Sequence, residues 1–195
     1  GKPTTEADPD HYEKAHAFCD LLVVGSGPSG LAAAISAGRC GLRVILVEDD
    51  ADLGGSLLGA GKDVASDQWL KSALAELETL PSVRVMTRTC AFGAYDNMTF
   101  ALLERVSDHL ATPAPFQPRQ RMWLVRAERA ILATGMIERP IVFGNNDLPG
   151  VMLASAARTY VNRYAVAPGS KVVVFTNNDT AYAAAWDLNA AGAEV

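Results

Sequence analysis

Residues 20–34 read DLLVVGSGPSGLAAA, an apolar run that meets three glycines and then a run of alanines. A continuous apolar run is typical of a strand that is covered on both faces. Gly25, Gly27 and Gly30 form a GxGxxG pattern directly after this strand, and Pro28 suits the first turn of a helix. The stretch therefore predicts a strand, a tight turn and a helix in direct succession.

Each glycine of the pattern has a physical reason. Gly25 permits the tight turn, Gly27 lets the backbone approach a pyrophosphate, and Gly30 lets the helix lie close to the sheet. The helix N-terminus offers unpaired N–H groups and a positive dipole end to phosphates. The next apolar segment, RVILVE, ends on Glu48, at the position where an acid binds an adenosine ribose. This context predicts an adenine-dinucleotide site in a βαβ unit.

The acidic residues after the second strand bear on the kind of dinucleotide. A carboxylate at Glu48 repels a 2′-phosphate, and Asp49 and Asp50 add to the repulsion. We therefore expect NAD or FAD in this site rather than NADP.

Two later stretches carry small residues that permit close approach to a ligand. LGGSLL contains Gly55 and Ser56, and Ser56 could donate to a phosphate or a ribose. ILATG ends on Ala133, Thr134 and Gly135 at the end of another apolar segment. An ordinary flexible loop and a simple strand-to-turn exit remain the alternatives for these two stretches.

The rest of the chain predicts an α/β fold. The expected elements are strands at 20–25, 43–48, 83–88, 98–106, 121–127 and 130–135, helices at 28–39, 64–79 and 152–165, and a second strand–turn–helix–strand succession from 171 to 195. We predict a Rossmann-like FAD/NAD(P)-binding domain with a parallel sheet and a β-meander, plus the start of a second βαβ domain. The expected divisions are a lead-in or linker at 1–19, the dinucleotide-binding domain at 20–140, and a linker helix with a truncated second unit at 141–195. The chain reads as a fragment of a longer polypeptide.

Composition excludes several classes of function. A net charge of −5 argues against a nucleic-acid partner, and no apolar run approaches the roughly 20 residues that span a bilayer. Three cysteines without a CxxC pair indicate neither a zinc ribbon nor a redox disulfide, and they suit a reducing cytoplasm. No nucleophile–base pair or cluster of metal-binding side chains stands out. We therefore expect no catalytic residue, no metal ligand and no membrane partner.

The GxGxxG pattern, the distant acid, LGG and ATG together resemble the flavoprotein reductases with two dinucleotide-binding domains. In that group the first domain usually holds FAD and the second holds NAD(P)H. The second turn of this chain, FTNNDTAYAAA, carries Thr176, Asn178 and Ala181 at the glycine positions. Side chains there crowd a pyrophosphate, so we expect the second unit to bind no nucleotide in the usual way.

The strings RTCAFGAYD, ATGMIERPIVFGNNDLPGVMLASAARTYVNRY and VVVFTNNDTAYAAAWDL resemble more specifically the α subunits of heterotetrameric sarcosine oxidases. The resemblance implies a complex that oxidatively demethylates sarcosine to glycine, with formaldehyde or methylene-tetrahydrofolate and H2O2 as products. It implies NAD⁺ in the first site, FAD and FMN elsewhere in the complex, and the other subunits as partners. The contacts that it implies fall on Ser29, Glu48, Asp49, Asp50, Ser56 and Ala91.

Two alternatives remain open. One is an FAD-binding module of an NADH-dependent flavoprotein reductase, and the other is a non-catalytic nucleotide-binding scaffold for the assembly of a complex. The amine substrate is open as well, among sarcosine, another N-methyl amino acid, proline and an opine-like amine.

Overall fold

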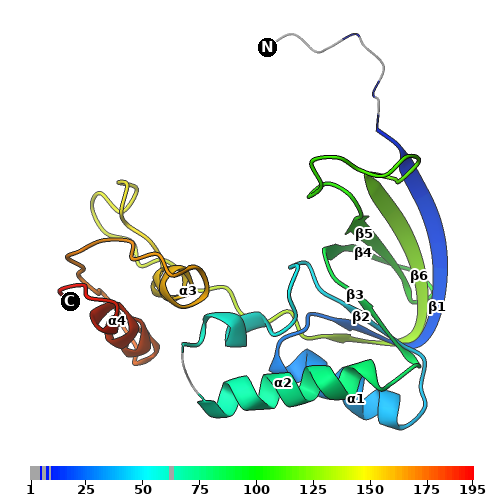
Figure 1. Ribbon diagram of the computed structural model, residues 1–195, viewed down its shortest axis with the longest axis horizontal. Helices are drawn as coiled ribbons and strands as arrows, with labels where there is room; N and C mark the ends of the chain where they lie inside the picture. Colours follow the sequence, from blue (N-terminus) through cyan, green and yellow to red (C-terminus); the bar gives the residue numbers. More distant parts are fainter. Residues whose placement is uncertain (1–4, 6–7, 9, 62–63) are drawn as a thin grey trace.

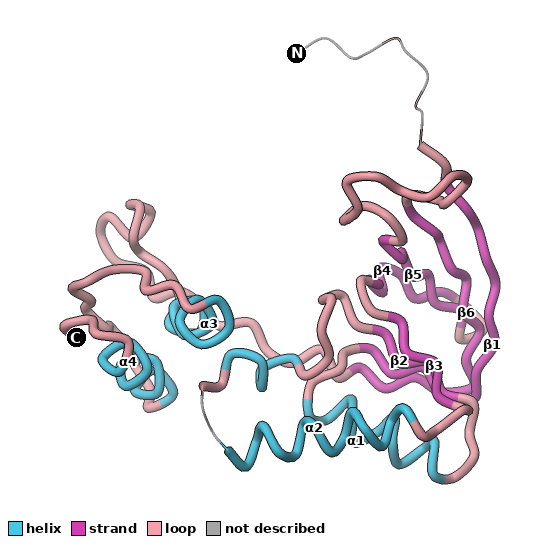
Figure 2. The backbone as a smooth tube through the Cα atoms, in the orientation of Figure 1, coloured by secondary structure: helices cyan, strands magenta, loops and turns pink. Residues whose placement is uncertain are grey.

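The computed structural model describes residues 5, 8, 10–61 and 64–195 (Figure 1). The strands are β1 (Tyr12–Val24), β2 (Val44–Val47), β3 (Val83–Met86), β4 (Thr89–Tyr95), β5 (Thr99–Arg105) and β6 (Gln120–Leu132). The helices are α1 (Pro28–Arg39), the 3₁₀ turn η1 (Gly55–Gly59), α2 (Val64–Glu78), α3 (Ala154–Tyr164) and α4 (Thr180–Ala190). Figure 2 shows a strand-rich body that α1 and α2 line, and a separate arm that carries α3 and α4.

One sheet of six strands organises the body, in the order β3-β2-β1-β6-β5-β4. β1 runs parallel to β2 and β6, and β2 runs parallel to β3. β4, β5 and β6 form an antiparallel meander. All four residues of β2 are buried, as the apolar run predicts for a central parallel strand. The predicted Rossmann-like α/β fold with a parallel sheet and a meander is confirmed.

The hydrophobic core lies on both faces of this sheet. The cluster between the sheet and helices α1 and α2 includes Leu21, Val23, Leu31, Ile35, Leu46 and Leu77. The cluster on the opposite face includes Leu22, Ile45, Leu102, Trp123 and Val125. Burial on two faces fixes the carboxyl ends of β1 and β2, and these ends position the candidate site.

The strand bounds differ from the prediction at β1. Residues 12–19, predicted as a lead-in or linker, form the first half of this strand and pair with β6 from Tyr12↔Gln120 onward. The polar look of the segment comes from one face only, because Ala15 and Ala17 pack inward. The linker prediction was therefore wrong for this part of the chain.

The meander also differs from the prediction. The two strands predicted at 121–127 and 130–135 are one continuous strand, β6, since the exposed Glu128 and Arg129 do not interrupt its pairing with β1. β4 was not predicted as a strand, and it forms the outer strand of the meander.

The predicted helices 28–39, 64–79 and 152–165 are confirmed as α1, α2 and α3. In the second unit α4 forms, but the two expected strands reduce to one parallel bridge between Lys171 and Glu194. Val173 is 94% exposed, and within the described residues no neighbouring strand covers it. A parallel pair needs such neighbours to become a ladder. The division of the chain into domains stays a prediction.

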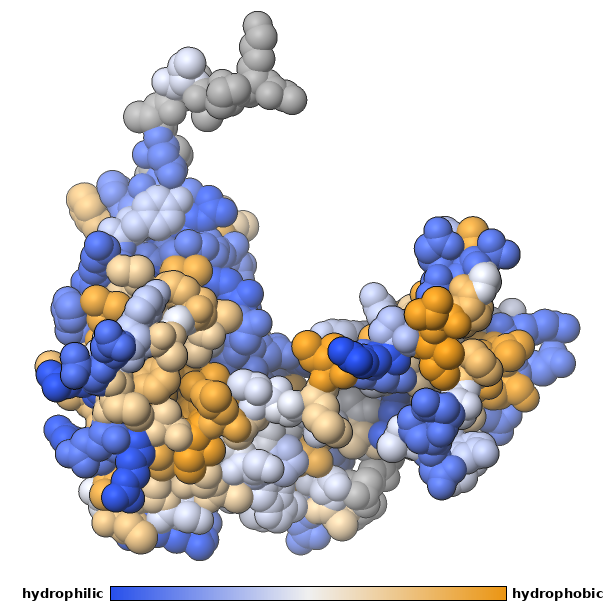
Figure 3. Space-filling model, turned by 180° about the vertical axis from the view of Figure 1, so that it is seen from behind, coloured by the Kyte–Doolittle hydropathy of each residue, from blue (hydrophilic) through white to orange (hydrophobic). Residues whose placement is uncertain are grey.

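The arm presents much of its apolar surface to solvent. Figure 3, which views the molecule from behind, shows apolar side chains gathered on the arm. The exposed apolar residues of this half include Met136, Ile137, Val142, Val173, Phe175 and Trp186. Within the part of the chain that the structure describes, no helix is long and apolar enough to cross a membrane.

Candidate functional site

The turn between β1 and α1 is built from backbone that packs on backbone. Gly25 has φ +99°, a conformation that favours glycine, and its N–H donates to the carbonyl oxygen of Val47 at 2.8 Å. A Cβ at Gly25 would lie 2.4 Å from the carbonyl oxygen of Ala133, and one at Gly30 would lie 1.8 Å from the carbonyl oxygen of Gly25. Both positions therefore require glycine for the fold itself.

Gly27 differs from these two glycines. It is the N-cap of α1, and a Cβ there would meet no heavy atom of the described residues within 4 Å. The first N–H groups of a helix lack intrahelical acceptors, and they attract anions. The turn is therefore a cradle with open space at Gly27, and the space and the donors fit a pyrophosphate.

The carboxylate of Glu48 is fastened to this turn. Its Oε2 accepts hydrogen bonds from the N–H (2.8 Å) and the hydroxyl (2.6 Å) of Ser26, which is fully buried. Its Oε1 accepts from the N–H of Asp50 at 2.9 Å. A carboxylate offers about four acceptor positions, so these three donors leave room for one ribose hydroxyl. The contact with a ribose stays a prediction, but the acid lies beside the glycine turn as that role requires.

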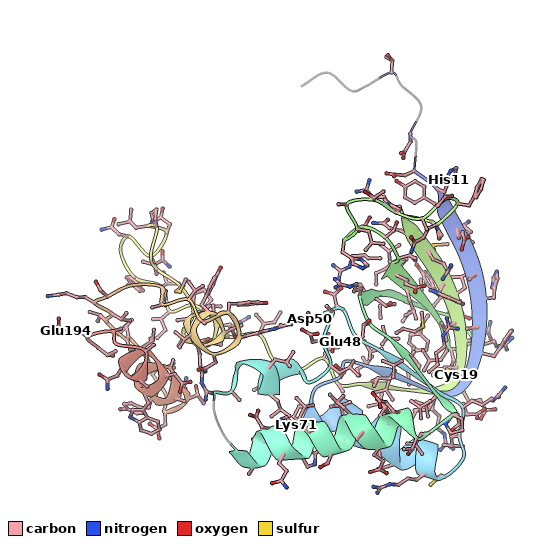
Figure 4. The ribbon with its side chains drawn as sticks, in the orientation of Figure 1. His11, Cys19, Glu48, Asp50, Lys71 and Glu194 are labelled. Atoms are coloured by element: carbon pink, nitrogen blue, oxygen red, sulfur yellow. The ribbon has the colours of Figure 1, made fainter. Side chains whose placement is uncertain are left out.

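Arginines bind the two aspartates that follow. Arg105 donates to the Oδ1 of Asp49 at 3.0 Å and also to its carbonyl oxygen. Arg163 makes a two-pronged ion pair with Asp50, at 2.5 Å and 3.1 Å. Figure 4 shows Glu48 and Asp50 together on the loop after β2, with Asp50 toward α3.

These ion pairs change the charge of the loop. Hydrogen bonding to Arg163 holds the pKa of Asp50 at about 2, and Asp50 in turn raises the pKa of Arg163. Both groups remain charged near neutral pH. The repulsion that Asp49 and Asp50 were expected to add against a 2′-phosphate is therefore offset, and their direct contact with a dinucleotide stays a prediction.

The double glycine of LGGS lies against the first turn. The N–H of Gly54 donates to the carbonyl oxygen of Ser26 at 3.1 Å, and a Cβ at Gly55 would lie 2.8 Å from the Cα of Gly27. The loop therefore lies against the glycine turn, and its close approach to a ligand stays a prediction. Ser56 and Ser29 are both exposed near this junction, where they are free to face a ligand.

The end of β6 closes the other side of the turn. The N–H of Ala133 donates to the carbonyl oxygen of Val24 at 2.7 Å, and the Cα of Thr134 would lie 3.3 Å from a Cβ at Gly25. Gly135 follows with φ +71° and open space around it. The ATG segment therefore meets the glycine turn, and its close approach to a bound dinucleotide stays a prediction.

Ala91 is placed less directly. It lies on β4, is partly buried, and packs against the core cluster that contains Trp123. Two residues earlier, the N–H of Thr89 donates to the carbonyl oxygen of Glu48 at 2.8 Å. This bond ties the start of β4 to the ribose acid, and the role of Ala91 in binding stays a prediction.

Three residues of the site were not predicted from the sequence: Ser26, Arg105 and Arg163. Ser26 carried a signal, because it follows Gly25 at the end of β1, beside the parallel strand that ends on Glu48. Arg105 and Arg163 carried none, since they lie 56 and 113 residues along the chain from the aspartates that they bind.

The second βα turn, before α4, is closed by its own side chains. The Oδ1 of Asn178 accepts from the N–H of Thr180 at 3.0 Å and from its hydroxyl. The hydroxyl of Thr176 accepts from the N–H of Asn178 at 3.2 Å. Within the described residues, no group of three or more His, Cys, Asp or Glu side chains is placed to hold a metal ion.

Comparisons with known proteins agree with this picture. The family described as FAD dependent oxidoreductase matches residues 20–120. The chain is 52% identical over its whole length to the α subunit of sarcosine oxidase from Rhizobium meliloti (strain 1021), and 45% identical over 96% of its length to that from Corynebacterium sp. (strain P-1). It spans about a fifth of the length of these curated relatives, with 20% covered in each. A solved structure of the L-proline dehydrogenase from P. horikoshii is similar over 93% of this chain and 35% of that chain, with a TM-score of 0.73 and 26% identity.

Proposed function

This chain belongs to the FAD dependent oxidoreductase family, and we propose that its glycine turn binds an adenine dinucleotide within an amine oxidase of several subunits, of the sarcosine oxidase type. The observation that carries the proposal is the open cradle at Gly27 beside Glu48, which Ser26 holds in place. This geometry suits an adenosine diphosphate, the half that NAD⁺ and FAD share.

We propose NAD⁺ as the occupant and FAD as the second candidate. NAD⁺ is what the resemblance of the sequence strings implies, and FAD is supported by the family to which the chain belongs. The contacts proposed for either dinucleotide are Gly25, Gly27, Ser29, Gly30, Glu48, Asp49, Asp50, Gly55, Ser56, Ala91, Ala133, Thr134 and Gly135. The bound nucleotide would be held by its phosphates and its ribose, and no residue of this chain is proposed as catalytic.

The reaction proposed for the complete enzyme is the oxidative demethylation of sarcosine to glycine, in a cytoplasmic complex with other subunits and with FAD and FMN bound elsewhere. Proline and an opine-like amine are the competing substrates. They are supported by the likeness to an L-proline dehydrogenase and to a subunit of the opine oxidase of Agrobacterium tumefaciens (strain Ach5), which is 27% identical over 90% of this chain.

A flavin reductase module is the alternative enzyme. It needs a binding site for NADH in the second unit. In the turn before α4, the side chain of Asn178 already accepts the N–H and the hydroxyl of Thr180. A non-catalytic nucleotide-binding scaffold for assembly is the non-enzyme alternative, and the open space at Gly27 speaks only against a scaffold that holds no nucleotide.

The nucleotide that the protein releases on acid denaturation tests the proposal. We would purify the complete protein, count its bound nucleotides by mass spectrometry, and repeat the count with a Gly27→Val variant. One equivalent of NAD⁺ that the variant loses supports the proposal. Loss of FAD from the variant assigns FAD to this site, and an unchanged count of every dinucleotide refutes binding at the turn.

A further inference from the structure

Arg163 links the arm to the candidate site. Its guanidinium lies 2.5 Å from Oδ2 of Asp50 and 2.8 Å from Oδ2 of Asp52, and its side chain is only 19% exposed. Arg163 belongs to α3, so the cation reaches the loop after β2 from the other half of the chain.

The loop after β2 carries an excess of negative charge, which Arg163 partly neutralises. Residues 48–52 carry four carboxylates, on Glu48, Asp49, Asp50 and Asp52. The pyrophosphate of a dinucleotide brings two further negative charges. The loop cannot move away from the glycine turn without cost, because Ser26 holds both Glu48 and Gly54. The side chains of Asp50 and Asp52 are 41% and 66% exposed, so salt screens their charges in part, and without a paired cation they oppose an anionic ligand at low salt.

We propose that Arg163 is a positioning residue that sets the affinity of the first turn for anionic dinucleotides, because its positive charge offsets one of the two negative charges of Asp50 and Asp52. The proposal rests on the proposed function, since it presumes that a dinucleotide binds at the turn. It gives α3, the helix that precedes the second unit, a role in the first site.

A purely mechanical role for Arg163 is the competing explanation, and the structure separates the two. Other residues also hold α3 in place. Arg158 donates to the carbonyl oxygen of Ala60, just after η1, and to Asp187 of α4 at 2.5 Å. Asn162 donates to the carbonyl oxygen of Gly59 at 3.0 Å. Loss of Arg163 therefore leaves α3 docked, whereas it leaves two carboxylates unpaired beside the site.

The test measures dissociation constants for NAD⁺ and, separately, FAD by calorimetry on the complete protein after its bound nucleotide has been removed. Arg163→Met removes the neutralising cation. Arg158→Met is the matched control. It removes an arginine of the same helix that holds α3 through Ala60 and Asp187 and does not contact Asp50 or Asp52. The triple variant Asp50→Asn, Asp52→Asn, Arg163→Met removes the cation together with the charges that it balances.

We expect Arg163→Met to weaken binding about tenfold, and Arg158→Met to change it by less than about twofold. The triple variant has a loop that is less negative than the wild type by one charge, so it should bind at least as tightly as the wild type, and the penalty of Arg163→Met should shrink as salt rises. A triple variant as weak as Arg163→Met overturns the charge explanation in favour of a mechanical one. Unchanged binding by Arg163→Met overturns this inference alone, whereas a wild-type protein that binds neither dinucleotide overturns the proposed function as well.

Discussion

The turn before α1 and the turn before α4 each lead from an apolar run into a helix, and they differ in what their donors bind. In the first, residues 24–30, the packed glycines bring α1 close to the sheet and leave open space at its N-terminus. In the second, residues 175–181, the side chain of Asn178 accepts the N–H and the hydroxyl of Thr180. The first turn needs an external partner for its donors, and the second supplies a partner of its own.

The fold of a turn that leads into a helix is therefore separable from its ability to bind an anion. A helix N-terminus favours negative charge in either case. Where a side-chain oxygen already accepts the first N–H groups, as Asn and Ser do at helix caps, an anion has little to gain. Under the proposal for Arg163, the helix that precedes the second unit contributes a cation to the first site.

The largest loss of stability is expected from a substitution at Gly30, in the first turn. Gly30→Ala places a Cβ against the carbonyl oxygen of Gly25, and backbone cannot move aside as a flexible side chain can. We expect a loss of about 3 kcal/mol in the free energy of unfolding, measured by urea titration. Ser36→Ala, at an exposed site of the same helix, is the control and should stay within about 0.5 kcal/mol. Equal midpoints for Gly30→Ala and the wild type would contradict the packing argument.

The next effect separates binding from folding at the same turn. Gly27→Val adds a side chain where the described residues leave space, so stability should change by less than about 1 kcal/mol. Dinucleotide binding should fall by about a hundredfold, because the side chain takes the place of the pyrophosphate. Gly144→Val is the control, since Gly144 also has open space but lies far along the chain. If both variants bind equally well, the cradle has been assigned to the wrong residue.

The sequence predicted the first turn well, because its signals are local. The apolar run, the glycine spacing and Glu48 lie within 29 residues, from 20 to 48, and each has one physical reading. The first half of β1 was missed because Glu13, Lys14 and His16 mask the inward-facing alanines between them. The period-2 alternation was nevertheless there to be read.

The electrostatics of the site could not be predicted in the same way. Whether Asp50 repels a phosphate or is neutralised depends on Arg163, which the fold brings in from 113 residues away. The single bridge at Lys171 is a similar case, since the apolar run VVVF predicts a strand but pairing depends on neighbours. Local pattern predicts an element, and tertiary contacts decide its charge and its pairing.

A smaller effect tests the ribose acid of the first turn. Glu48→Ala removes a charge-assisted hydrogen bond to the ribose, so binding of NAD⁺ should weaken by about 1.5–3 kcal/mol by calorimetry. Ser26→Ala keeps Glu48 but removes the hydroxyl that donates to it at 2.6 Å. We expect this variant to weaken NAD⁺ binding by about 1 kcal/mol. Unchanged affinity in Glu48→Ala would rule out the ribose role.

The smallest change in stability is expected from a substitution at Asn178, in the turn before α4. Asn178→Ala removes the side-chain oxygen that accepts the N–H of Thr180, just before the N-cap Asp179, so the free energy of unfolding of the second unit should fall by about 1 kcal/mol. Hydrogen exchange at the first amides of α4 reports this loss, and the number of bound dinucleotides should remain unchanged. A second bound dinucleotide in this variant would show that Asn178 alone closes the turn. An unchanged count means that Thr176 and Ala181 also keep a pyrophosphate away, as crowding at the glycine positions requires.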